Sequence, residues 1–232
     1  MGEFAHGGPH LPKQPGRRRR HTTATWSGGN KQMATAMLVL FSYLLGSIPS
    51  AYVAGRVLKG IDIRKVGDGN VGAANVYRAV GPPAGIATLV ADACIGAVAA
   101  IVAQAFASQP VVFLAGLAVV AGHNWPVYIG FRGGRGEATA IGVLSVLLPQ
   151  AMFILLAVCA VPFLITRNTM LAGAILFAPL WLVALLMRMP GPLVVYSVVL
   201  PCLVGFTHLL TTRHLPKDVK KAAIYMRWER GA

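Results

Sequence analysis

The feature that most constrains this chain is a series of long apolar runs separated by short polar loops. An α-helix needs about 20 mostly apolar residues to cross the hydrocarbon core of a bilayer, and candidate spans cover 33–58, 84–107, 111–129, 169–187 and 192–210. The chain is 56% hydrophobic and 12% charged, whereas a soluble domain carries about twice that charged fraction. We therefore predict an all-α, polytopic membrane protein.

The charge balance narrows the choice of partner. The net charge of +14 comes from 21 Lys and Arg against 7 acidic residues, an excess that suits nucleic acid, anionic lipid headgroups or an anionic substrate. Because most of the chain is expected in lipid, we expect no nucleic-acid partner. Few acidic residues also argue against a carboxylate-bound metal. The cysteines lie in apolar runs without CxxC spacing, which predicts small hydrophobic side chains in helices.

Composition divides the chain into three parts. Residues 1–32 are polar and basic without apolar periodicity, which predicts a disordered tail; it is either dispensable or a polybasic lipid contact. Residues 33–212 form the expected membrane domain. Residues 213–232 are basic and amphipathic, which predicts a cytoplasmic tail.

Loop charges decide how the apolar stretch 138–166 crosses the membrane. The basic loops at 59–83 and 130–137 are two crossings apart, hence on one side, and the positive-inside rule places both in the cytoplasm together with the C-terminal tail. That requires an even number of crossings after Glu137, which a break at Pro149 supplies. We therefore expect seven membrane segments with the N-terminus outside. The segment before Pro149 is only about 18 Å long as a helix and is partial.

Two glycine-rich loops carry the candidate chemistry: GDGNVGAANVYR at 67–78 and GHNWPVYIGFRGGRGEAT at 122–139. Glycine lets backbone N–H groups approach an anion, and forked arginine donors suit phosphate oxygens. A basic loop can also simply anchor topology, and His123 alone can be a bonded helix-end residue. The literal GxGxxG match is no dinucleotide site, because a membrane-length run follows it. Asp92 lies at membrane depth, which makes it a functional candidate, and Pro49 within GSIPSA predicts local opening of the first span.

These loops carry a resemblance to a known family. GSIPSAYVAGR, DIRKVGDGNVGAANVYRAVG and GHNWPVYIGFRGGRGEAT resemble, in order and spacing, the bacterial PlsY-type acyl-phosphate:glycerol-3-phosphate acyltransferases. The resemblance covers residues 38–142, and the remainder only by hydropathy. It implies a seven-span inner-membrane enzyme that transfers a fatty acyl group from acyl phosphate to the 1-hydroxyl of glycerol 3-phosphate, giving lysophosphatidic acid and phosphate in phospholipid synthesis. No cofactor or metal is implied. We expect a monomer whose active site faces the cytoplasm.

The resemblance also assigns site residues by position. The implied catalytic residues are Ser47, Arg64, Asn75, Arg78, His123 and Asn124. The implied phosphate-binding residues are Ser50, Gly69, Asn70, Gly72, Gly133, Gly134, Arg135, Gly136 and Thr139. Without a protein nucleophile, positioning and charge stabilisation would supply much of the acceleration, because acyl phosphate is already activated.

Several positions depart from the family pattern. Asp68 stands where a small hydroxyl is expected, Ala74 replaces a threonine, and Ile95 replaces a phosphate-binding lysine. Glu137 follows GGRG where an apolar residue is usual, and the terminal motif survives only as Arg213–His214 with Glu229. An alternative function is therefore a catalytically weak paralogue that binds lipid phosphate or a partner protein. A solute transporter is disfavoured, because there is no internal repeat and the polar residues gather on one side.

Overall fold

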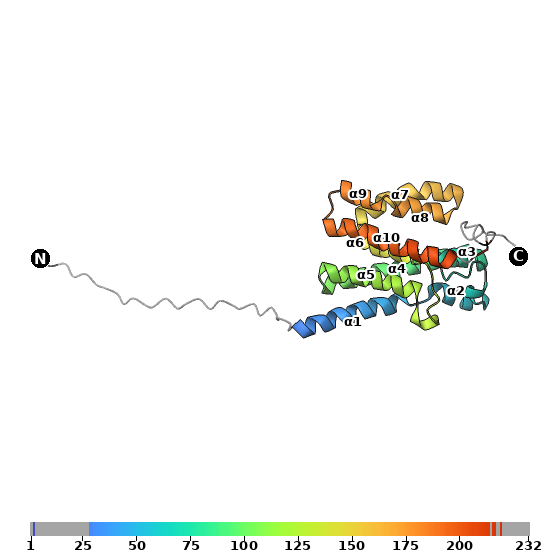
Figure 1. Cartoon of the computed structure of the whole chain (residues 1–232), viewed down its shortest axis with the longest axis horizontal. Helices are drawn as coiled ribbons and strands as arrows, with labels where there is room; N and C mark the ends of the chain where they lie inside the picture. The colour runs from blue at the N-terminus through green and yellow to red at the C-terminus, as the bar shows by residue number, and fades with distance from the viewer. Residues whose placement is uncertain (1, 3–27, 214, 217–218, 220–232) are drawn as a thin grey trace.

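The chain folds into a helical bundle with its polar loops gathered at one end (Figure 1). The computed structural model describes Gly2 and residues 28–213, 215–216 and 219. In that part of the chain the elements are α1 (Gly28–Gly46), α2 (Ser50–Lys59), η1 (Ile63–Lys65), α3 (Ala73–Ala79), α4 (Pro82–Phe106), α5 (Gln109–Asn124), η2 (Val127–Ile129), α6 (Glu137–Leu147), α7 (Pro149–Thr166), α8 (Thr169–Phe177), α9 (Leu180–Leu186) and α10 (Gly191–Thr212). These ranges contain no strand, and the all-α prediction is confirmed.

Membrane-length helices account for most of these elements. Within the described residues, six stretches are long and apolar enough to cross a bilayer: 29–59, 82–106, 109–129, 149–166, 169–186 and 191–212. Helix α6 is a shorter apolar helix, about 16 Å long at 1.5 Å per residue. Together they make the seven full or partial membrane segments that the sequence predicts.

Proline sets the two breaks that matter most for topology. Helix α1 ends at Gly46 and α2 starts at Ser50, with Pro49 at the N-cap of α2, as predicted from GSIPSA. Helix α7 starts at Pro149, where proline lacks an N–H that would be unsatisfied anyway. The stretch 138–166 therefore crosses as two helices. Figure 1 shows α1 starting at one end of the bundle and α10 finishing at the other, which an odd number of crossings requires.

Glycine brings helix backbones into direct contact in the part of the bundle that holds the site. In α1 and α5, Gly46 faces the Val119 carbonyl and Gly122 faces the Tyr43 carbonyl, so closely that a Cβ at either glycine would collide with backbone. Gly96 of α4 lies equally close to the carbonyl of Thr139 in α6. In lipid there is no hydrophobic driving force for helices to associate, and small residues instead allow their backbones to pack closely.

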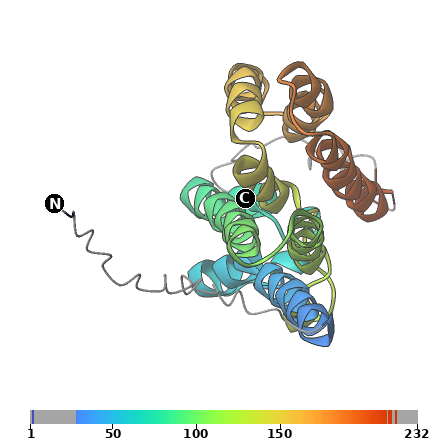
Figure 2. The same cartoon turned by 90° about the vertical axis from the view of Figure 1, so that its left-hand side faces the viewer.

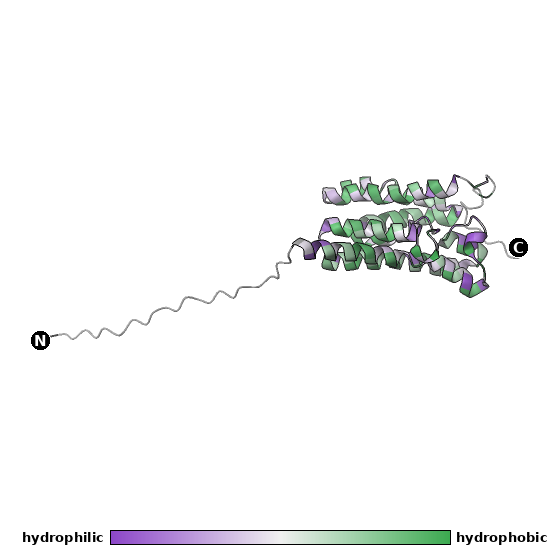
Figure 3. Cartoon of the chain, turned by 60° about the horizontal axis from the view of Figure 1, so that its bottom comes forward, coloured by the Kyte–Doolittle hydropathy of each residue, from purple (hydrophilic) through white to green (hydrophobic). Residues whose placement is uncertain are grey.

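Apolar side chains cover the outside of the bundle, as a lipid-facing surface requires. Exposed examples from different helices are Leu40, Val90, Phe153, Trp181 and Phe206. Viewed from one end, α7 to α10 form a layer beside the group of α1, α4 and α5 (Figure 2). Figure 3 shows hydrophilic residues concentrated at the end that holds α2, α3 and the loops.

The domain limits expected from composition stay a prediction. Helix α1 begins at Gly28 rather than at Met33. The basic tail before Gly28, and most of the C-terminal tail after Arg213, lie outside the described residues. Helices α1 to α10 occupy residues 28–212.

Candidate active site

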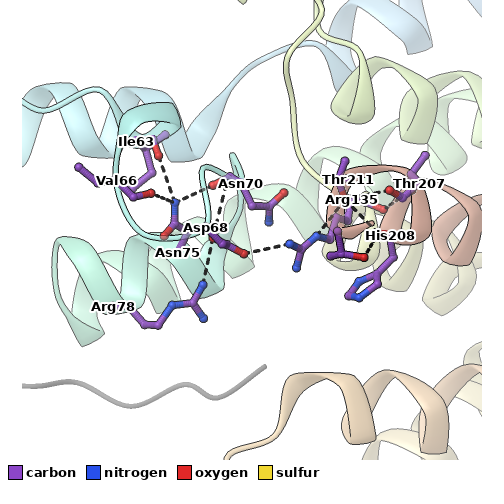
Figure 4. A network of polar contacts seen from close by, with 11 residues as sticks. Ile63, Val66, Asp68, Asn70, Asn75, Arg78, Arg135, Thr207, His208 and Thr211 are labelled. Carbon is purple, nitrogen blue, oxygen red and sulfur yellow. Dashed lines mark hydrogen bonds and ion pairs between the residues drawn. The ribbon is translucent and has the colours of Figure 1, made fainter. Parts of the chain in front are cut away.

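The two glycine-rich loops meet at the carboxylate of Asp68. Its Oδ1 lies 3.1 Å from Nη2 of Arg78, and its Oδ2 lies 2.9 Å from Nη2 of Arg135 (Figure 4). The side chains of Asp68, Arg78 and Arg135 are 2%, 15% and 11% exposed. The two loops, both expected on the cytoplasmic side, therefore converge on one point.

Helix α3 presents Arg78, and Asn75 one turn earlier fixes the loop that leads into it. The Asn75 side chain is fully buried, and its Nδ2 lies 3.1, 3.1 and 3.0 Å from the carbonyl oxygens of Ile63, Val66 and Asn70. Its Oδ1 occupies the space beside Gly67, whose φ of 60° favours glycine. Asn75, implied to be catalytic, therefore holds the loop from below.

The environment of Arg78 is unusual for an arginine. Burial lowers its pKa, and the neighbouring Asp68 carboxylate opposes that shift. Both loops thus contribute a partly desolvated guanidinium to the same point, where an anion interacts more strongly than it would in water.

The end of helix α10 positions Arg135. The Arg135 Nε donates to Oγ1 of Thr211 at 3.3 Å, and the Thr207 hydroxyl donates to the Arg135 carbonyl at 3.1 Å. These threonines are four residues apart, hence on one face of the helix, and His208 lies beside them in Figure 4. This contribution of α10 was not predicted from the sequence. Its signal is a pair of hydroxyls at helical spacing in an otherwise apolar run.

A second polar cluster lies deeper, around Asp92 of α4. The Ser50 hydroxyl donates to Oδ1 of Asp92, and Nδ1 of His123 lies 3.8 Å from the same oxygen. Asp92 is 1% exposed and His123 is 9% exposed. The other ring nitrogen of His123 faces Gly134, where a Cβ would collide with it. Asp92 thus joins Ser50 and His123, both implied site residues, beneath the second loop.

The amides of Gly133 and Gly134 do not form an open anion cradle in this structure. They donate to the carbonyls of Asn124 and His123 at 3.2 and 3.0 Å. The last carbonyls of a helix lack intrahelical donors, and the loop supplies them at the end of α5. The arginine side chains, rather than these amides, are therefore the donors presented to a ligand.

Arg64 lies apart from the Asp68 pair, in a cluster of its own. Its guanidinium bonds Asp62 at 2.8 Å, donates to the Ile129 carbonyl at 2.9 Å and stacks 4.9 Å above the Tyr52 ring. Hydrogen bonding from Arg64 holds the pKa of Asp62 well below its usual range. Since the folded-state pKa is lowered, the pair stabilises the fold above about pH 4, and that stabilisation is lost as the pH falls through the folded pKa.

The remaining implied residues lie at helix ends or in the loops. The hydroxyl of Ser47 donates to the Tyr43 carbonyl at 2.9 Å, while the Gly69 amide donates to the Val66 carbonyl at 3.0 Å. Gly72 is the N-cap of α3 and Gly136 that of α6. Among the described residues, Asn70 Oδ1, Asn124 Oδ1 and Thr139 Oγ1 are buried without a hydrogen-bond partner. Figure 4 places the Asn70 side chain between the Asp68 loop and Arg135, where a bound ligand can satisfy it.

Comparison with known proteins agrees with this architecture. The family model described as glycerol-3-phosphate acyltransferase matches residues 36–217. Glycerol-3-phosphate acyltransferase 4 of Dehalococcoides mccartyi is 47% identical over 178 residues, 76% of this chain and 96% of that protein. The glycerol-3-phosphate acyltransferase of Rubrobacter xylanophilus is 38% identical over 190 residues, which are 82% of this chain and 95% of that protein.

Solved structures show the same likeness. The crystal structure of PlsY, an integral membrane glycerol 3-phosphate acyltransferase, in its glycerol 3-phosphate form is 35% identical with a TM-score of 0.70, over 81% of this chain and 98% of that chain. The structure of its lysophosphatidic acid form is 34% identical with a TM-score of 0.68, and the match covers 78% of this chain and 90% of that chain. Sequence, family model and fold agree over the region that holds the two loops, and the chain belongs to the glycerol-3-phosphate acyltransferase family.

Proposed function

We propose that this protein transfers a fatty acyl group from acyl phosphate to the 1-hydroxyl of glycerol 3-phosphate, giving lysophosphatidic acid and phosphate. The observation that carries the proposal is the convergence of Arg78 and Arg135, from separate glycine-rich loops, on one partly buried point. Two forked cations at that point suit the oxygens of a phosphate monoester. Both proposed substrates carry that group.

The reaction balances without a nucleophile from the protein. The hydroxyl oxygen of glycerol 3-phosphate attacks the acyl carbonyl carbon, and the bond from that carbon to the phosphate-bearing oxygen breaks. Phosphate leaves with the bonding electrons and takes the hydroxyl proton. The arginines stabilise the charge that gathers on the leaving group, a kind of stabilisation that contributes much of many enzymes' acceleration.

The bundle supplies the two environments that such a reaction needs. The arginines lie at the polar end, while the described helices expose apolar side chains toward the surrounding lipid. A long acyl chain can stay in lipid while its phosphate reaches the loops. We place the site at the cytoplasmic face of the bacterial inner membrane, with the protein acting as a monomer.

A donor comparison tests the function. Purified protein in nanodiscs is given labelled glycerol 3-phosphate with a long-chain acyl phosphate, and separately with the matching acyl-CoA. We expect labelled lysophosphatidic acid only with acyl phosphate. Product from acyl-CoA alone would overturn the proposed donor.

One observation favours the second candidate, a weakly catalytic paralogue that binds lipid phosphate. Asp68 already neutralises part of the charge of both arginines. Tight binding of glycerol 3-phosphate without product from either donor would support that candidate.

A further inference from the structure

Asp68 binds the two arginines that the proposed function assigns to a substrate phosphate. Each of its carboxylate oxygens takes one arginine from a different loop, at 3.1 and 2.9 Å. Two oxygens of a phosphate monoester require the same donors. Because ionised hydrogen bonds of this kind are about twice as strong as neutral ones, ligand binding has to replace a substantial interaction within the protein.

We propose, on the basis of the proposed function, that Asp68 is an internal competitor of the substrate phosphate and sets the affinity of the site for it. In the free protein the carboxylate holds Arg78 and Arg135 together. A phosphate monoester displaces the carboxylate from the arginines and takes over both contacts. Asp68 thereby lowers the affinity for phosphate-bearing ligands while keeping the two loops together in the absence of substrate.

Charge explains why the phosphate displaces Asp68 rather than binding alongside it. The two guanidinium groups carry two positive charges, and Asp68 neutralises one of them. A phosphate monoester adds about −1.5 to −2 at neutral pH. Leaving Asp68 in place would put two anions against the same pair of arginines, which are only 15% and 11% exposed. Like charges repel strongly where water is scarce.

The loop geometry indicates that the carboxylate leaves by side-chain rotation. Asn75 ties the backbone on both sides of Asp68 through the carbonyls of Val66 and Asn70. The Gly69 amide is also bonded, to the Val66 carbonyl at 3.0 Å. By contrast, among the residues that the structure describes, the Asp68 carboxylate accepts, apart from its arginine partners, only a long contact from the Asn70 amide, at 3.4 Å. The side chain is therefore the part of this loop that is free to exchange partners.

Direct binding measurements test the proposal without depending on turnover. Wild type, Asp68→Asn and Asp68→Ser are placed in nanodiscs of uncharged lipid and titrated calorimetrically with inorganic phosphate and with glycerol 3-phosphate. We expect both variants to bind both ligands at least about tenfold more tightly, which corresponds to about 1.4 kcal/mol. In the acyltransferase assay the KM for glycerol 3-phosphate should fall while kcat stays near that of wild type, because the competitor is displaced in ground and transition states alike.

Asp62 supplies the matched control. It is another carboxylate on the same loop and also pairs with two arginines, Arg64 at 2.8 Å and Arg56 at 3.5 Å. These are not the arginines held by Asp68. Asp62→Asn removes the same charge from the loop, yet it should change phosphate affinity less than about twofold, because its partners Arg64 and Arg56 are 29% and 47% exposed, so that solvent screens the site from the change in charge.

The possible results separate this proposal from the proposed function. Thermal melts first establish that each variant is folded, and the serine variant provides a second test if the asparagine variant is not. Phosphate affinity that is unchanged or weaker in a folded Asp68 variant would overturn the proposal. So would a large fall in kcat at unchanged KM, since that would give Asp68 a role in the reaction itself. If binding tightens but no donor gives product, the competitor role stands and the acyltransferase proposal fails.

Discussion

Two arginines in the same short motif have different surroundings in this protein. Arg132 and Arg135 both belong to GFRGGRG, yet Arg132 is exposed whereas Arg135 bonds Asp68 and Thr211. Motif and charge cannot distinguish them. The difference arises from the packing of α10 against the second loop, between segments far apart in sequence.

That difference predicts unequal effects of substitution. Arg135→Ala should lower kcat/KM for glycerol 3-phosphate by about a hundredfold or more, because it removes a charged donor from the site of charge development. Arg132→Ala should leave kcat/KM within about threefold, as expected for an exposed charge. Initial rates with acyl phosphate measure both. Equal losses in the two variants would indicate that general surface charge, and not the paired arginines, attracts the substrate.

Asn75 and Arg78 lie one turn apart in α3 but have different roles. Asn75 is buried and bonded to three carbonyls, while Arg78 reaches Asp68. The sequence placed both in the site, and the structure places one beneath it and one within it. A glycine-rich loop needs an internal support, and a motif alone does not show which polar residue provides it.

Asn75→Ala should therefore lower stability as well as activity. Loss of the amide leaves buried carbonyls unpaired, at a cost of about 1–3 kcal/mol. Thermal melting in detergent measures the change. Asn70→Ala is the control, because the described structure gives its side chain no hydrogen bond through Oδ1, and its melting temperature should stay near that of wild type. A melting temperature for Asn75→Ala equal to that of Asn70→Ala would contradict the support role.

Much of the site was predictable and some of it was not. The pairing of the two loops follows from topology and loop composition, and it needed no side-chain detail. The role of Asp68 did not follow, because a carboxylate beside two arginines can either repel a ligand or bridge the arginines, depending on side-chain direction. The threonines of α10 were missed because their partner lies more than seventy positions earlier in the chain.

At the scale of elements, glycine contacts fix how α4 and α6 pack. Gly142 lies against the Ala93 backbone, so closely that a Cβ there would collide with the carbonyl. Helix α6 is short and begins at Glu137, directly after the loop that carries Arg135. Its position against α4 therefore determines where that loop stands.

Gly142→Ala should lower the melting temperature, because overpacking against backbone costs about 1–3 kcal/mol. Gly205→Ala in α10 is the matched control. Nothing lies within 4 Å of a Cβ at Gly205, and alanine is the better helix former, so its melting temperature should be unchanged or slightly higher. Tolerance of Gly142→Ala to the same degree would mean that α4 and α6 are not in the close contact described.

At the scale of the whole molecule, the charges of the loops predicted the number of membrane crossings better than the hydropathy of the chain did. The run 138–166 shows little apolar interruption, and length alone permits a single helix. The requirement for an even number of crossings after Glu137 led to the break at Pro149, where α7 does begin. The division of the predicted span 169–187 into α8 and α9 was not predicted, since Pro179 lies within a uniformly apolar stretch and helix interiors sometimes accommodate proline in membranes.

The same charge argument gives each end of the bundle an expected side of the membrane. Basic residues of the described loops gather at the site end, including Arg56, Lys65 and Arg132, whereas Arg188 lies in the turn between α9 and α10 at the other end (Figure 1). From the positive-inside rule we therefore expect the site end to lie in the cytoplasm.

Cysteine labelling tests this orientation directly. In a background where Cys94, Cys159 and Cys202 are replaced by alanine, Lys65→Cys and Arg188→Cys each add one exposed thiol, at opposite ends of the bundle. A membrane-impermeant maleimide should label Arg188→Cys in intact spheroplasts and Lys65→Cys only in inside-out vesicles. Because the reagent cannot cross the bilayer, the two variants control for each other. The reverse pattern would put the paired arginines outside the cell, away from cytoplasmic glycerol 3-phosphate, and labelling of both variants from one side would require an even number of crossings between α3 and α10.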